Sequence, residues 1–401
     1  MKHKKSQLKK MAITAIVMFL FLNGAILAQV SDTTLKNYYE SKNFYSKILD
    51  ETRLIHIYTP SHQKNNGVYP VLYVLDGEAM MRMITGQVDY LSQSYKIIPS
   101  MIIVAIENTD RIRDLTPTHS IIGPDGKPDS SANAFGKNSG RGDKMLQFIQ
   151  QELMPYINNN YSAAPYNILF GHSLGGLMAV HALVNHPGLF NAHIALSPSL
   201  QWDNQLLLKQ VTSLKSEKIK GELFFSDANE SPAFHNNQLR LDSFLKQKNI
   251  PGFNFEYNYY PEETHISVPV KGFYDGIKHI YPNWYLNYNS SAFRKTMTAK
   301  MVIEQYEYLS KKYGYQVIPL QDEINLIVRM LRRDHTKIND AIELLEINAI
   351  NYPSSATVLE LLGDTYLKSG DKKKAIDAYR KADTLDKNNE TIKQKIKDLN
   401  N

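Results

Sequence analysis

The chain has 401 residues, a formal net charge of +6 and no cysteine, which excludes disulfides, thiolate chemistry and a lipidated N-terminal cysteine. Five of its lysines lie within the first ten residues, so residues 29–401 carry 41 Lys and Arg against 40 Asp and Glu. The basic character therefore belongs to the N-terminus, and binding to nucleic acid has no support.

Residues 1–28 have the three parts of a secretory signal peptide. Five lysines precede an apolar run at Met11–Leu22, and small residues follow at Ala25–Ala28. The run is shorter than the ~20 residues that a membrane-spanning helix needs. We expect cleavage after Ala28 and export to the periplasm or outside the cell. An uncleaved signal, which would anchor the protein to a membrane, is the alternative.

Residues 29–290 alternate strand-like apolar runs with helix-like segments, which predicts an α/β domain with a mostly parallel sheet. Tyr45, Leu54 and Ile57 belong to a predicted antiparallel pair at its start. Residues 121–143 are rich in Gly, Pro, Ser and Asn, and we expect a lid or substrate wall there. Asp143 is predicted to cap the helix Met145–Tyr156.

The C-terminal part is predicted to be all helical, with a linker at residues 291–320 and a tetratricopeptide-like region at 321–401. Lys300–Tyr313 forms a predicted helix that Gly314 ends. The repeat is indicated by seven residues at tetratricopeptide spacing: Leu362, Gly363, Tyr366, Gly370, Ala375, Tyr379 and Ala382. A degenerate copy of it lies 34 residues upstream. These helices either bind a protein partner or cap the α/β domain, and we expect them, with the helix Lys300–Tyr313, to pack against that domain.

The most informative motif is GHSLGG at residues 171–176, between the strand-like Ile168–Phe170 and the helix-like Leu177–Val184. A strand-to-helix turn of this kind exposes a serine nucleophile, here Ser173, and its glycines leave room for the turn. The N–H of Leu174 would hold the oxyanion of the reaction. A second oxyanion donor is expected after the strand Val71–Leu75, at Gly77 or Glu78, where Gly77 allows close approach to the substrate.

A serine nucleophile needs a histidine and an acid that follow it in the chain. His265 is the candidate base, because it lies in a loop after the strand Phe253–Tyr260. His181 and His186 are interpreted as packing or surface residues. The acid should follow the strand Leu223–Phe225, where Glu230 is the first candidate and Asp227 the second. Glu262 and Glu263, in the loop of His265, rank behind both. Either of the first two could instead cap the next helix.

Two residues are candidates for substrate binding. Arg111, in the loop after the strand Met101–Ile106, would hold an acidic group, or would pair with Asp110 or Asp114 to pin the loop. Trp202 would line an acyl or aromatic pocket, or would fill the core. No HExxH motif and no His/Asp cluster at metal-ligand spacing is found in the sequence, so we expect neither a metal nor another cofactor.

Six motifs in order resemble the esterase family that includes esterase D-like enzymes and the enterobactin-type siderophore esterases. They are VLYVLDG at 71–77, IENTDR at 106–111, RDLTP at 113–117, GHSLGG at 171–176, SPSL at 197–200 and ETH at 263–265. The resemblance covers roughly residues 32–285. It implies an α/β-hydrolase fold, a serine esterase mechanism and no metal.

Carried over from this family, Ser173 resembles the nucleophile and His265 the base. Asn229-Glu230 is similar to a pair found in many relatives, which favours Glu230 over Asp227. The chain departs from the family at Ala228 and Ser231, where relatives often have glycine. The family's substrates include siderophore trilactones, feruloyl or acetyl esters of polysaccharides, and small thioesters.

The sequence therefore predicts an exported serine esterase that acts on a small-molecule or glycan-linked ester. An acyltransferase that uses an alcohol in place of water is one alternative. The other is a non-catalytic hydrolase fold that binds a partner through its tetratricopeptide-like tail.

Overall fold

The computed structural model describes residues 38–60, 67–123, 126–131, 134–213, 219–286 and 290–400. The predicted signal peptide, residues 1–28, lies outside the described residues, and export stays a prediction. Residues 41–401 form one compact unit. Among the described residues, no helix has both the length and the apolar composition required to cross a membrane.

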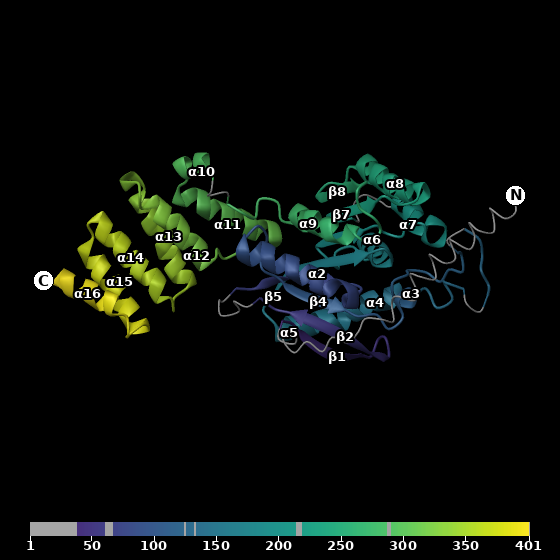
Figure 1. Cartoon of the computed structure of the whole chain (residues 1–401), viewed down its shortest axis with the longest axis horizontal. Helices are drawn as coiled ribbons and strands as arrows, with labels where there is room; N and C mark the ends of the chain where they lie inside the picture. The colour runs from purple at the N-terminus through teal and green to yellow at the C-terminus, as the bar shows by residue number, and fades with distance from the viewer. Residues whose placement is uncertain are drawn as a thin grey trace. The chain divides into compact units, whose positions relative to one another are not determined.

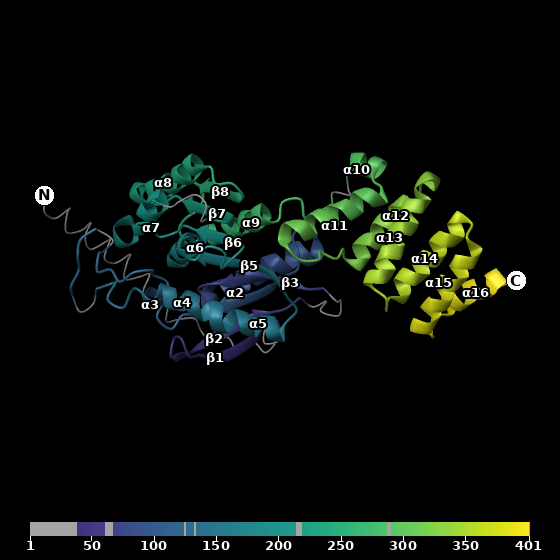
Figure 2. The same cartoon turned by 180° about the vertical axis from the view of Figure 1, so that it is seen from behind.

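One eight-stranded sheet forms the centre of the predicted α/β domain (Figures 1 and 2). Its strand order is β1-β2-β4-β3-β5-β6-β7-β8. The strands from β4 through β8 in this order run parallel, and β2 runs antiparallel to β4. The strands are β1 (Glu40–Ser46), β2 (Glu51–Tyr58), β3 (Tyr69–Val74), β4 (Ile102–Ile106), β5 (Ala163–His172), β6 (Ala192–Leu196), β7 (Gly221–Ala228) and β8 (Phe253–Tyr260).

These strands confirm the predicted mostly parallel sheet and the strand pair at its start. β1 and β2 are adjacent, and residues 47–50 between them are too few for a parallel crossover. Every residue of β4 and β6 is buried, as expected for parallel strands covered on both faces. The carboxyl ends of β3 through β8 lie along the same edge of the sheet, where ligands bind in such folds.

Helices cover both faces of the sheet. One face packs against α2 and α9, and the other forms a large apolar core with α4 to α8. The helices of this part are α2 (Gly77–Asp89), α3 (Arg111–Asp114), α4 (Gly142–Phe148), α5 (Met154–Asn160), α6 (Leu174–Asn185), α7 (Trp202–Ser213), α8 (Pro232–Lys248) and α9 (Val268–Ile280), with π-helical turns at Tyr90–Ser94 and Ile149–Leu153.

The described chain after α9 contains helices and no strands, as predicted. α11 ends at Gly314, whose φ of 73° is the left-handed conformation that glycine adopts at low cost. The elements are α10 (Ser291–Thr296), α11 (Ala299–Tyr313), α12 (Gln321–Leu331), a 3-10 turn (His335–Lys337), α13 (Ile338–Asn351), α14 (Ala356–Ser369), α15 (Lys372–Leu385) and α16 (Glu390–Asn400).

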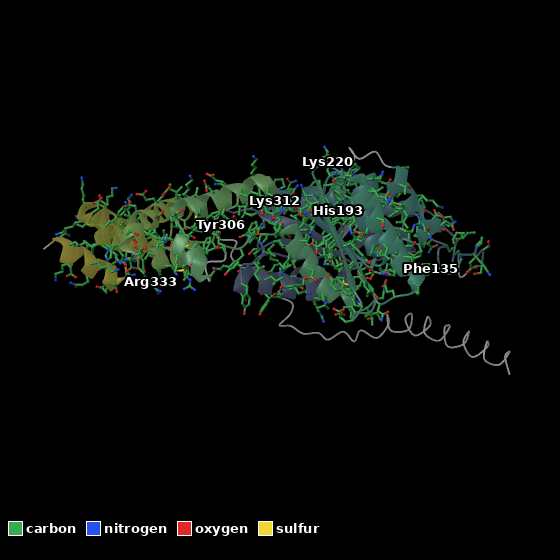
Figure 3. All side chains as sticks on the ribbon, turned by 90° about the horizontal axis from the view of Figure 1, so that it is seen from above. Phe135, His193, Lys220, Tyr306, Lys312 and Arg333 are labelled. Atoms are coloured by element: carbon green, nitrogen blue, oxygen red, sulfur yellow. The ribbon has the colours of Figure 1, made fainter. Side chains whose placement is uncertain are left out.

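α11 joins the helical region to the sheet region. The Tyr313 hydroxyl donates a hydrogen bond of 2.9 Å to the carbonyl of Ile280, the last residue of α9. Nζ of Lys312, which Figure 3 labels, lies 3.3 Å from the carboxylate of Glu222 in β7. The expectation that this helix packs against the α/β domain is therefore confirmed.

The prediction that Asp143 caps its helix is wrong. The helix begins at Gly142, and its N-cap residue is Arg141, whose side chain makes no capping hydrogen bond. Asp143 lies in the first turn, and its carboxylate contacts two histidines of another helix instead. The Asp143 carboxylate thus accepts hydrogen bonds from imidazoles that are distant in sequence, and not from the first N–H groups of its own helix.

The pair α14 and α15 depends on a small residue at Gly363. A Cβ atom there would lie 2.5 Å from the ring of Tyr379, which is buried and donates a 2.6 Å hydrogen bond to Asp364. We expect Gly363→Ala to lower the free energy of unfolding by about 1–3 kcal/mol through overpacking. Gly86→Ala is the matched control, because it also lies in a helix but has open space around it.

In the control the better helix propensity of alanine should raise stability by up to about 1 kcal/mol. Urea unfolding followed by circular dichroism measures both variants. A Gly363→Ala protein as stable as the wild type would contradict the packing argument.

His193 of β6, labelled in Figure 3, is buried in the sheet. Burial lowers the pKa of His193 from 6.5 to about 4. Between these pH values the imidazole is mostly neutral in the folded protein and mostly protonated in the unfolded chain. Stability from this group is therefore present above pH 6.5 and is lost as the pH falls toward 4. Between pH 7 and pH 5 we expect the wild type to lose about 2 kcal/mol more than His193→Asn, measured by urea unfolding. Equal losses in the two proteins would contradict this.

Candidate active site

Ser173 occupies a strained turn between β5 and α6. Its φ is 60°, which is uncommon for a residue other than glycine. Its N–H donates a 2.9 Å hydrogen bond to Leu196 at the end of β6, and its carbonyl accepts one of 3.1 Å from the N–H of Ser199. Two bonds to the neighbouring strand end therefore hold the turn in place.

The glycines of the turn are required by close packing, as the sequence predicted. A Cβ atom at Gly171 would lie 2.0 Å from the carbonyl oxygen of Gly175, and one at Gly176 would lie 2.9 Å from that of Leu196. No side chain fits either position. The turn thus brings the first turn of α6 close to β5 and β6, with Ser173 at its tip.

The Ser173 hydroxyl is partly exposed at the carboxyl edge of the sheet. Its Oγ lies 3.4 Å from Oγ of the buried Ser199. Leu174 is the first residue of α6, and the first N–H groups of a helix have no partner within that helix. The N–H of Leu174 can therefore serve a negatively charged oxygen next to Ser173.

His265 and Glu230 form a pair at the same edge. Nδ1 of His265 is hydrogen-bonded to Oε1 of Glu230, whose side chain is only 7% exposed, whereas the imidazole is 40% exposed. The loops that carry them are joined by a 2.9 Å hydrogen bond from the N–H of Asn229 to the carbonyl of Glu263. A carboxylate on Nδ1 fixes the tautomer that leaves the lone pair on Nε2, which a base requires.

His172 lies against this imidazole. The two rings are 4.6 Å apart between centroids, and His172 immediately precedes Ser173. Burial, followed by the nearby His265, lowers the pKa of His172 to about 3, so its ring is neutral. The phenyl ring of Phe234 packs edge-on against the His265 imidazole, with ring centroids 5.8 Å apart. Sequence reasoning did not single out His172, although it stands inside the GHSLGG motif.

The structure places Glu230, and not Asp227, against His265. Asp227 instead bonds Nδ1 of His235 at 2.7 Å and accepts a 2.7 Å hydrogen bond from the Tyr257 hydroxyl. Burial raises the pKa of Asp227 although both bonds oppose this. Neither acid caps α8, because the Ser231 side chain accepts the capping hydrogen bond.

The other two acids considered lie elsewhere. Glu262 pairs with Lys271. Glu263 accepts a 2.5 Å hydrogen bond from the Ser267 hydroxyl. Both side chains hold the loop and the start of α9 together.

The loop after β3 lies against the turn, and packing requires its Gly77 to be glycine; the part of Gly77 in the oxyanion hole stays a prediction. A Cβ atom at Gly77 would lie 2.8 Å from backbone atoms of Ile106, so the glycine allows α2 to approach β4. Asp76 directly before it has a left-handed φ of 56°. A Cβ atom at Gly175 would lie 3.2 Å from the Asp76 carboxylate, which places the start of α2 beside the nucleophile turn.

Arg111 pins this region, with a different partner from the two predicted. Its guanidinium forms a bidentate pair with Asp76, at 2.6 and 2.9 Å, and also donates to the carbonyl of His172 at 3.3 Å. Asp110 instead accepts from the N–H of Arg113 and begins α3. The bidentate bond holds the guanidinium against Asp76, and the binding of an acidic substrate group by Arg111 stays a prediction.

Trp202 lies in the core beside the site and contacts the 121–143 loop. It is 7% exposed, and its indole N–H donates a 3.3 Å hydrogen bond to the carbonyl of Thr118. Its ring centroid lies 6.5 Å from that of the half-exposed Phe135, which Figure 3 labels within the loop. Core filling is therefore its observed role, and the loop is anchored next to it.

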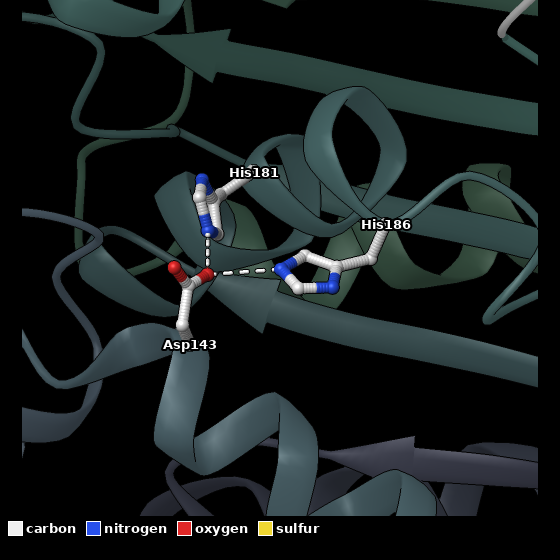
Figure 4. Close-up of side chains that lie close together, drawn as sticks. All are labelled: Asp143, His181 and His186. Carbon is white, nitrogen blue, oxygen red and sulfur yellow. Dashed lines mark hydrogen bonds and ion pairs between the residues drawn. The ribbon is translucent and has the colours of Figure 1, made fainter.

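Three residues outside this site form a cluster that sequence reasoning missed. Nε2 of His181 and of His186 lie 2.7 and 2.9 Å from the same oxygen of Asp143 (Figure 4). Burial would raise the pKa of Asp143, but hydrogen bonds from the two imidazoles lower it below its usual range. Burial also lowers the pKa of His181 despite the carboxylate. The sequence signal that could have indicated this cluster is the pair of histidines five residues apart at the end of a helix.

Comparisons with known proteins agree with this architecture. The family model described as Putative esterase matches residues 46–245, and a tetratricopeptide repeat model matches residues 356–389. The crystal structure of an IroE-like serine hydrolase from Shewanella oneidensis is 33% identical, with a TM-score of 0.64, over 79% of this chain and 98% of that one.

Two curated relatives are named as siderophore esterases. The ferri-bacillibactin esterase of Bacillus subtilis is 28% identical over 243 residues, which are 55% of this chain and 82% of the relative. The siderophore triacetylfusarinine C esterase of Aspergillus fumigatus is 28% identical over 183 residues, 42% of this chain and 58% of the relative. The chain therefore belongs to the family described as Putative esterase, and it is a carboxylic ester hydrolase of the α/β-hydrolase fold with a C-terminal tetratricopeptide-like region.

Proposed function

We propose that this protein is an exported serine esterase that hydrolyses siderophore esters through Ser173, His265 and Glu230. The observation that carries the proposal is the imidazole of His265, held by Glu230 and lying against His172, the residue before Ser173. Buried carboxylate, partly exposed imidazole and partly exposed hydroxyl thus occur at one edge of the sheet, and the nucleophile, acid and base follow the chain order of this fold.

The chemistry follows from these positions. Ser173 Oγ attacks the ester carbonyl carbon while Nε2 of His265 takes the hydroxyl proton. The oxygen that becomes negative is held by the N–H of Leu174 and by an N–H at the start of α2, at Gly77 or Glu78. The imidazolium then gives its proton to the leaving alcohol, and an acyl group remains on Ser173.

Hydrolysis of the acyl-enzyme uses the same groups in reverse. His265 takes a proton from water, the hydroxide attacks the acyl carbon, and the carboxylic acid leaves as Ser173 Oγ regains the proton. Glu230 keeps Nδ1 protonated throughout and stabilises the imidazolium in both halves of the reaction.

The substrate class rests on the relatives, two of which are named for siderophore substrates. A siderophore lactone or ester is therefore the substrate that we propose, ahead of feruloyl or acetyl esters of polysaccharides. Export is proposed from the lysine-rich, apolar and small-residue segments of residues 1–28.

Removal of the nucleophile or base should abolish turnover. We expect Ser173→Ala and His265→Ala to lower kcat/KM on p-nitrophenyl acetate and on a catecholate trilactone by at least about 1000-fold, because triad members act as a unit. His279→Gln is the control, since His279 also bonds a carboxylate, Glu256, at 3.0 Å. The proposal fails if the wild type hydrolyses neither ester, or if the alanine variants match the control.

The identity of the acid gives a separate prediction. Glu230→Gln keeps the shape of the side chain but loses the charge on Nδ1, so we expect kcat to fall about 100-fold or more. Asp227→Asn should change kcat less than tenfold, because Asp227 bonds His235 and Tyr257 instead of His265. Steady-state kinetics on both variants, after circular dichroism confirms folding, decides between them. A larger loss in Asp227→Asn would reverse the assignment.

A further inference from the structure

The cluster of Asp143, His181 and His186 has the composition of a metal site and takes no part in the proposed reaction. Each residue offers one ligand atom, and the three atoms lie within 4.8 Å of one another. Figure 4 shows both imidazoles directed at one oxygen of Asp143. His181 lies eight residues after Ser173 in α6, which is about 12 Å along the helix.

From this geometry we infer that Asp143, His181 and His186 bind a single Zn²⁺ ion. Two imidazole nitrogens and one carboxylate oxygen are a known three-residue ligand set for zinc, with water in the fourth position. Ligand atoms around tetrahedral zinc are separated by roughly 3.3 Å, given bond lengths near 2.0–2.1 Å. The present separations of 2.7 and 2.9 Å between the imidazole nitrogens and the carboxylate oxygen are shorter than this, and the three atoms span up to 4.8 Å, so the carboxylate and the His186 imidazole must shift for an ion to enter.

The exposure of the three side chains allows the movement that zinc binding requires. The His181 side chain is 7% exposed and fixes one ligand in place. The side chains of His186 and Asp143 are 27% and 56% exposed, so both can adjust. Because Asp143 is exposed, solvent can reach the fourth position of the ion.

A polar partner for the buried ligand is present. Nδ1 of His181 lies 3.0 Å from the side-chain amide of Asn185, which in turn lies 3.0 Å from the Gln210 side chain. When Nε2 gives its lone pair to zinc, the imidazole proton resides on Nδ1 and needs an acceptor. Rotation of the Asn185 amide by 180° supplies its oxygen, and rotation of Gln210 restores the second bond.

Bound zinc would connect α4 to α6. α4 begins at Gly142, at the end of the 121–143 segment, and α6 begins at the nucleophile turn. An ion held by Asp143 from the first and by His181 and His186 from the second would cross-link them. The ion would take no part in the proposed reaction, so this inference stands independently of the esterase proposal.

The test measures zinc binding by untagged full-length protein in competition with a fluorescent chelator, with Zn²⁺ alone as the probe. We expect one equivalent bound with a dissociation constant in the micromolar range or tighter. His186→Ala and Asp143→Ala should each weaken binding at least tenfold. His279→Gln should bind like the wild type, because His279 is paired with one carboxylate and no second imidazole.

Wild-type protein alone gives a second readout that does not depend on the folding of a variant. Zn²⁺ should raise the Tm, since the ion binds only the folded site. Substitution with Co²⁺ should give the visible absorption of a four-coordinate ion. Lack of stoichiometric binding by the wild type, or equal binding by all three variants, would overturn the site. Lack of the cobalt absorption would overturn it as well.

Discussion

The backbone turn at Ser173 is the constraint on which the rest of the site depends. It holds a non-glycine residue at a positive φ, and hydrogen bonds to Leu196 and Ser199 keep it there. A Cβ atom at Gly171 or Gly176 would lie 2.0 or 2.9 Å from a backbone oxygen, so only glycine fits at either position. The surrounding packing and hydrogen bonds hold the strained residue in place, and the result is a hydroxyl fixed at the edge of the sheet.

Other residues of the site are fixed relative to this turn by polar contacts between loops. Arg111 connects the loop after β4 to Asp76 after β3 and to the carbonyl of His172. The N–H of Asn229 donates to the carbonyl of Glu263, so the loop of the acid is joined to the loop of the base. Because each contact joins the ends of different strands, the catalytic geometry depends on the register of the whole parallel sheet.

Aromatic packing attaches the C-terminal helical region to the α/β domain. Tyr313 of α11 packs edge-on against Tyr166 of β5, with ring centroids 5.1 Å apart, and lies 4.9 Å from the ring of Tyr281. Its hydroxyl also bonds the end of α9. Apolar ring area and one buried hydrogen bond together make α11 part of the compact unit rather than a free linker.

Much of the fold and site could be predicted because the relevant signals are local. Apolar runs, helix-ending glycines and the GHSLGG turn depend on neighbouring residues, so the strands, α11 and the position of Ser173 followed from the sequence. His265 followed from its loop position after β8. Glu230 was favoured over Asp227 by family resemblance, and the structure places it at His265.

What only the tertiary structure decided concerns partners far apart in the chain. Asp143 has the sequence features of a helix cap, but it contacts His181 and His186, 38 and 43 residues away. Arg111 was expected to pair with near neighbours and pairs with Asp76. The sequence by itself determined which residues have the required chemistry. Strand register and helix packing determined which of them meet, because a side chain's partner is set by distance in space and not by spacing along the chain.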